Sequence, residues 1–152
     1  MRLGIDVTDD YLRRATPGIG SITQENGYNE KSHNEEISMS EWILRTLGGE
    51  IFLLTDMGGT YHGKRPDFLW NNKFWELKTV GSEKATDSAL RKAIKQIYFN
   101  PGGIILDYGK KEINTNAIMR AINTRMTKSG KFTADVLIIQ GEKLQKALRF
   151  RV

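Results

Sequence analysis

The sequence predicts an α/β domain built on a mixed β-sheet. Segments with a helical spacing of apolar residues alternate with short apolar or alternating segments that are typical of strands. Glycine, proline and asparagine separate most of these segments, with no internal repeat and no interior linker. The chain has 152 residues, of which 39% are hydrophobic, enough for one core. We therefore expect one domain at residues 34–152, preceded by an irregular lead-in at residues 1–33.

The first half of this domain is expected to contain a helix and three strands. Residues 36–47 carry apolar side chains at spacings of three, four and seven, and Gly48 and Gly49 end this amphipathic helix. Strands are predicted at residues 51–54, 68–70 and 74–80. Asn71 and Asn72 favour a tight turn between the last two strands, which should form a hairpin.

The second half alternates helices and strands. An apolar stripe predicts a helix that Asp87 or Ser88 caps and that ends at Ile97, before a turn rich in glycine. Apolar runs at residues 103–107 and 134–139 predict buried strands, and residues 114–128 between them predict another helix. A short C-terminal helix is expected at residues 142–148.

Charge and composition exclude several classes of function. Lysine and arginine total 23 against 18 acidic residues, and the net charge of +5 favours a polyanionic partner without naming one. There is no cysteine, which excludes a disulfide framework, a thiolate zinc site and a cysteine nucleophile. No apolar run reaches the roughly 18 residues of a membrane-spanning helix, and no secretory signal begins the sequence. We expect a chain without a membrane anchor that another protein carries if it leaves the cell.

The residues best suited to catalysis lie in the expected hairpin. Asp67 begins one strand, and Glu76 and Lys78 share one face of its partner, so the turn brings all three together. Two carboxylates suit a hard divalent ion such as Mg²⁺. An ammonium beside the ion is able to orient a water molecule or to offset charge on a phosphorane. This combination indicates a metal-dependent phosphodiesterase.

The same residues resemble a known family. Pro66 and Asp67, followed by Glu76, Leu77 and Lys78, resemble the motif of the PD-(D/E)xK nuclease superfamily. The expected order helix, three strands, helix, strand is similar to the restriction-endonuclease-like core of that superfamily. Four longer segments resemble the C-terminal tRNase toxin domains of contact-dependent growth inhibition (CdiA) proteins, namely residues 33–37, 42–44, 65–79 and 93–96.

This resemblance implies a toxin that hydrolyses phosphodiester bonds of tRNA with Mg²⁺ or Mn²⁺. It also implies a cognate immunity protein as partner, and action in the cytoplasm of a target bacterium after delivery within a larger secreted protein. The resemblance places Asp67 and Glu76 on the metal and Lys78 at the nucleophile, and it makes Glu36 the glutamate that completes the acidic set. Two neighbouring glutamates are alternatives to Glu36, namely Glu35 and Glu41.

Further residues are candidates for substrate binding. Lys64 and Arg65 stand next to the motif and are expected to contact substrate phosphates. Gln96 is similar to a position where many members of the superfamily place a polar residue near the site. A ribonuclease mechanism based on histidine would require His33 and His62, the only two histidines, to meet.

Two alternatives to a tRNA nuclease remain. DNA offers the same phosphate as RNA, so a DNA endonuclease of the same fold fits the motif equally well. A non-catalytic module that binds nucleic acid, for instance as part of a phage, would show salt-sensitive binding without turnover.

Overall fold

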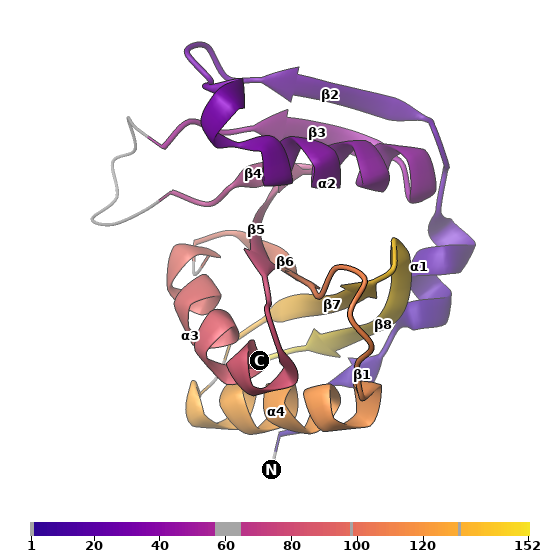
Figure 1. Cartoon of the computed structure of the whole chain (residues 1–152), viewed down its shortest axis with the longest axis vertical. Coiled ribbons are helices and arrows are strands. Elements are labelled where there is room, and N and C mark those ends of the chain that lie inside the picture. Colours follow the sequence, from indigo (N-terminus) through magenta and orange to yellow (C-terminus); the bar gives the residue numbers. More distant parts are fainter. Residues whose placement is uncertain (1, 57–64, 98, 131) are drawn as a thin grey trace.

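A computed structural model describes residues 2–56, 65–97, 99–130 and 132–152. These residues form an α/β fold in which four α-helices cover an eight-stranded mixed sheet (Figure 1). The helices are α1 (Thr8–Arg14), α2 (Asn34–Thr46), α3 (Thr86–Ile97) and α4 (Thr115–Lys128). The strands are β1 (Ile5–Asp6), β2 (Gly20–Gln24), β3 (Gly49–Leu53), β4 (Phe68–Trp70), β5 (Lys73–Thr79), β6 (Pro101–Asp107), β7 (Ala134–Gln140) and β8 (Lys143–Phe150).

The sheet has the strand order β1-β8-β7-β6-β5-β4-β3-β2. Strands β5, β6 and β7 pair in parallel, as do β2 and β3, whereas β4 is antiparallel to both of its neighbours. The carboxyl ends of β2, β3, β5, β6 and β7 therefore meet the amino end of β4 along one edge of the sheet. In Figure 1, β5 connects a part formed by β2, β3 and β4 with a part formed by β6, β7 and β8.

Both faces of the sheet are covered. In β6, Ile104 and Leu106 belong to the core beneath α3 and α4, whereas Ile105 belongs to the core beneath α2. All three side chains are fully buried. Continuous apolar runs of this kind are typical of parallel strands with helices on both sides, which is why the sequence indicated strands here.

The order of elements predicted from residue 34 onward is confirmed up to β7, with shifts of a few residues at the boundaries. The strand at residues 68–70 has the predicted bounds. Asn71 and Asn72 have φ angles of 50° and 66°, so both occupy the left-handed region that a two-residue hairpin turn requires. The turn aligns β4 with β5, pairing Phe68 with Trp75.

The expected irregular structure of residues 1–33 is wrong. This segment contains β1, α1, β2 and a 3₁₀ turn at Glu30–Ser32. Strand β2 pairs in parallel with β3, and β1 pairs with β8 at the opposite edge of the sheet. These short segments are held by partners far away in the sequence, so they need no periodicity of their own.

The C-terminal helix expected at residues 142–148 is also wrong, because these residues belong to β8. Gly141 and Glu142 both have a φ of 59° and form a tight turn that pairs β8 with β7. Leu144, Ala147 and Leu148 have a spacing that also suits a helix. A register shift between Ile138 and Ile139 accommodates that spacing in the sheet. No helix in the described part of the chain is long and apolar enough to cross a membrane.

Candidate active site

Asp67, Glu76 and Lys78 meet on the β4–β5 hairpin, at the edge where the parallel strands end. The backbone N–H of Asp67 donates to Oε1 of Glu76 at 3.1 Å, and the N–H of Leu77 donates to Oδ2 of Asp67 at 2.7 Å. Oε2 of Glu76 lies 3.2 Å from Nζ of Lys78. The predicted grouping of these three residues is thus present, and hydrogen bonds to the hairpin backbone fix both carboxylates.

The two carboxylates are difficult to ionise together. Glu76 is only 3% exposed, and burial raises its pKa, with the negative charge of Asp67 raising it further. Burial also raises the pKa of Asp67; the Leu77 N–H opposes this rise, whereas the charge of Glu36 adds to it. Lys78 lowers the pKa of both groups without compensating for burial. Without a cation, one of the two carboxyl groups therefore tends to keep its proton.

These residues fit a hard divalent cation. Two adjacent carboxylates supply oxygen ligands, and a cation would remove the electrostatic conflict between them. Asp67 and Glu76 would hold the ion. Within the described residues no set of three or more Asp, Glu or His side chains is arranged to bind a metal, and Mg²⁺ is commonly held by one or two carboxylates together with water.

Glu36 lies in the first turn of α2, within electrostatic reach of Asp67. Its charge contributes to the raised pKa of Asp67, as described above. Glu35 instead accepts a hydrogen bond from the Thr79 hydroxyl at 2.8 Å and lines a separate pocket. Glu41 is exposed further along the helix and lines another surface pocket. These positions favour Glu36 over its two alternatives.

The residues expected to bind substrate have different surroundings. Nη1 of Arg65 lies 2.7 Å from Oε1 of Glu25, and Nη2 lies 3.2 Å from Oε2, so the guanidinium forms a partly buried bidentate ion pair. Contact between Arg65 and substrate stays a prediction. Oε1 of Gln96 is buried and has no hydrogen-bond partner among the described residues. Lys64 and His62 lie outside the described residues.

Tyr28 is a residue of this site that the sequence did not reveal. Its hydroxyl is buried without a hydrogen-bond partner in the described part of the chain. Burial raises the pKa of this hydroxyl, and the charges of Glu36 and Asp67 raise it further, which places the phenol near the carboxylates. Tyr28 precedes α2 in a segment without periodicity, and only the folded structure brings it to the site.

His33 lies beside Tyr28, with ring centroids 4.8 Å apart. Its Nε2 is 3.0 Å from Oδ1 of Asp56, and its Nδ1 is 2.7 Å from the Asn29 carbonyl. Burial alone would lower the pKa of His33, but Asn29 and Asp56 outweigh burial and raise it. The imidazole is therefore anchored at both nitrogens immediately before α2.

The fold and this site define an α/β protein with a paired-carboxylate centre at the edge of a mixed sheet. Comparisons with protein-family models, with curated proteins and with solved structures found no match for the chain.

Proposed function

We propose that the chain is a divalent-metal-dependent nuclease of the PD-(D/E)xK type. The observation that carries this proposal is the contact of Asp67, Glu76 and Lys78 on one hairpin. The element order α2-β3-β4-β5-α3-β6, with β6 parallel to β5, agrees with the core that the sequence resemblance implies. The location of Glu36 near Asp67 supports it further.

The protein's own groups suit phosphodiester hydrolysis. The Lys78 side chain is 24% exposed, so its ammonium is accessible to a substrate while Glu76 orients it. In that position Lys78 would align the attacking water and stabilise the charge that develops on the phosphate oxygens. Bound Mg²⁺ or Mn²⁺, held by Asp67 and Glu76, would supply Lewis-acid stabilisation of the same charge. Exposed cations on α3 are available to attract the nucleic-acid backbone, namely Arg91, Lys92 and Lys95.

The substrate proposed first is tRNA, with a toxin role and a cognate immunity protein in the target bacterium. This choice depends on the sequence resemblance. The site residues would act on a phosphodiester group, which RNA and DNA share, so the geometry of the site does not distinguish the two. A DNA endonuclease of the same fold is therefore the alternative that the assay must separate.

The test incubates purified protein with total tRNA, another RNA and plasmid DNA, each with Mg²⁺, Mn²⁺ or EDTA. We expect cleavage of tRNA with a divalent ion and none with EDTA. Glu76→Gln and Lys78→Met should each abolish cleavage, whereas the exposed controls Glu112→Gln and Lys128→Met should cleave at the wild-type rate. Cleavage at the wild-type rate by either site variant, or salt-sensitive binding without turnover, would overturn the proposal.

A further inference from the structure

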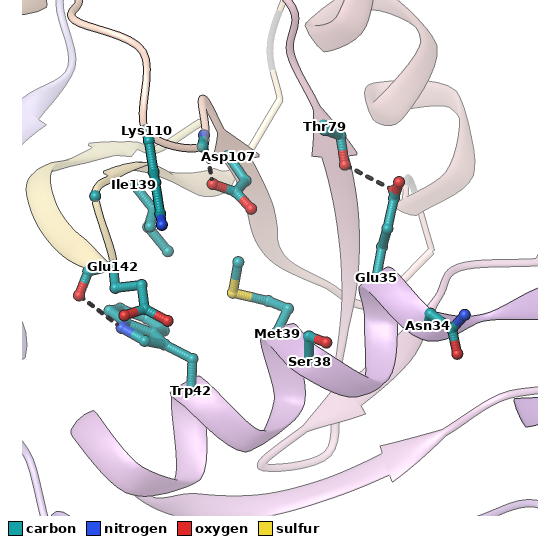
Figure 2. A pocket seen from close by; sticks show the side chains of 12 residues that line it. Asn34, Glu35, Ser38, Met39, Trp42, Thr79, Asp107, Lys110, Ile139 and Glu142 are labelled. Atoms are coloured by element: carbon teal, nitrogen blue, oxygen red, sulfur yellow. Dashed lines mark hydrogen bonds between the residues drawn. The ribbon is translucent and has the colours of Figure 1, made fainter.

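A second feature of the same sheet edge is a pocket of about 440 Å³ (Figure 2). It lies where α2 crosses the carboxyl ends of β5, β6 and β7, and Thr79 and Glu35 line it. Each of these residues is the chain neighbour of a proposed site residue, Lys78 or Glu36. Because successive residues of a strand point to opposite faces, the pocket and the carboxylate pair lie on the two sides of the same strand end.

The pocket has an apolar floor and a charged rim. Met39, Trp42 and Ile139 form the floor. The Trp42 indole N–H donates to the Glu142 carbonyl at 2.8 Å, which fixes the orientation of the ring. Figure 2 shows the Asp107 carboxylate, at the end of β6, and the Lys110 ammonium, from the loop after β6, directed toward the space over this floor.

The loops that follow β6 and β7 form one side of the rim. The Gly141 N–H donates to the Gly109 carbonyl at 2.7 Å, and both glycines have a positive φ that lets the two loops turn back over the sheet. Oδ1 of Asp107 accepts the Gly109 N–H at 3.0 Å, which holds the carboxylate in place. Among the described residues no ion pair engages Lys110, so its charge is available to a ligand.

We propose that this pocket binds an unpaired guanine base of the nucleic acid, next to the bond that is cleaved. This inference rests on the proposed nuclease function. The floor suits a flat aromatic ring. Guanine presents two adjacent donors, N1–H and N2–H₂, which match the Asp107 carboxylate, and beside them the O6 acceptor, which matches Lys110.

The other three bases and the phosphate groups of the nucleic acid fit this pocket less well than guanine does. Adenine and cytosine each present a ring nitrogen acceptor beside their amino group, and a carboxylate repels that acceptor. Uracil offers one donor between two acceptors. Three carboxylates on the rim, those of Glu35, Asp107 and Glu142, disfavour a phosphate in the pocket. A guanine base in the pocket, with its phosphate at Lys78 on the other side of β5, would occupy both the pocket and the carboxylate site.

The first experiment measures binding without catalysis. The inactive Glu76→Gln protein is titrated with guanosine, adenosine, cytidine and uridine at millimolar concentrations and followed by NMR chemical shifts. We expect guanosine to bind about tenfold more tightly than the other nucleosides. Asp107→Asn and Lys110→Met, each on the Glu76→Gln background, should lower the affinity for guanosine about tenfold, with Glu112→Gln as the control. Equal affinities, or no shift with guanosine, would overturn the proposal.

The second experiment separates this inference from the proposed function. The ends of products cut by the wild-type protein and by Lys110→Met are sequenced. A preference for guanine beside the cut that Lys110→Met weakens supports the pocket. Cleavage that ignores the neighbouring base overturns the pocket and leaves the nuclease proposal intact. Guanosine binding by a protein that cleaves nothing overturns the nuclease proposal and keeps the base site.

Discussion

The backbone N–H of Asp67 donates a hydrogen bond to the Glu76 carboxylate at 3.1 Å, and this contact joins the two acids of the hairpin. In return, Asp67 accepts the N–H of Leu77, the residue after Glu76, at 2.7 Å. Backbone groups that would pair across an ordinary hairpin are thus used to hold two carboxylates together. These hydrogen bonds hold the two carboxylates close together against their electrostatic repulsion. Without a cation, that repulsion lowers the stability of the folded protein.

Glu76→Gln should therefore raise the thermal stability of the protein in EDTA. The pKa of Glu76 in the folded protein lies above its ordinary value of 4.5, so the folded state binds a proton at this group more tightly than the unfolded state. The stability of the wild type therefore falls as the pH rises from 4.5 upward. Glutamine removes this penalty and keeps an acceptor for the Asp67 N–H. At pH 7 we expect Tm to increase by about 3 °C in differential scanning fluorimetry, corresponding to about 1 kcal/mol. A lower Tm in Glu76→Gln would contradict this account.

Divalent cations should stabilise the wild-type protein through the same pair. A concentration about 100 times Kd adds about 2.7 kcal/mol to the free energy of unfolding, provided the ion binds only the folded state. Because protons compete for both carboxylates, whose pKa values are raised, the gain with Mg²⁺ or Mn²⁺ should be larger at pH 8 than at pH 5. Thermal melts with and without EDTA measure the effect. Asp67→Asn should lose most of it, and an unchanged response in that variant would rule out the site.

Much of the fold from residue 34 onward could be predicted because its local patterns agree with its packing. The β4–β5 turn illustrates this agreement, since Asn71 and Asn72 tolerate the left-handed backbone that the hairpin needs. Strand β2 could not be predicted. Its side chains are exposed except for half-buried Ile22, and its position depends on pairing with β3. Strand β8 was missed because the spacing of Leu144 and Leu148 fits a helix as well as a strand with a register shift.

The candidate site, like the fold, could be predicted from the sequence only in part. The spacing of Glu76 and Lys78 along one strand already placed both on one face, and the turn placed Asp67 opposite them. Tyr28 could not be found in this way, because only the folded structure brings it within electrostatic reach of Asp67. The ion pair of Arg65 with Glu25, which lies on a distant segment, could not be found from spacing either. Sequence spacing thus located residues within a hairpin and missed partners from remote segments.

The Glu25–Arg65 ion pair should make the protein sensitive to acid. The Arg65 guanidinium, together with Thr55, lowers the pKa of Glu25 to about 2. A carboxylate with a lowered pKa adds stability above its ordinary value of 4.5, and this contribution disappears as pH falls from 4.5 to about 2. Glu25→Gln should cost about 1 kcal/mol at pH 7, a value reduced for the partial exposure of the pair.

Urea denaturation at pH 7 and at pH 3 tests this prediction for the wild type and Glu25→Gln. The difference between the two proteins should be smaller at pH 3 than at pH 7. Exposed Glu112→Gln serves as the control that should show no difference at either pH. An equal loss at both pH values would mean that the carboxylate charge of Glu25 does not contribute to folding.

Tyr28→Phe should make the protein more stable but less active. The hydroxyl of Tyr28 is buried and without a hydrogen-bond partner among the described residues, so its removal should raise the free energy of unfolding by about 1 kcal/mol. Burial, Glu36 and Asp67 keep this hydroxyl protonated, so in the proposed nuclease it would donate to a substrate oxygen. We expect kcat/KM for nucleic-acid cleavage to fall about tenfold in Tyr28→Phe, as for loss of one hydrogen bond in the transition state. Urea denaturation and initial rates at several substrate concentrations give both quantities. A variant that is less stable and fully active would show that the hydroxyl has a structural role only.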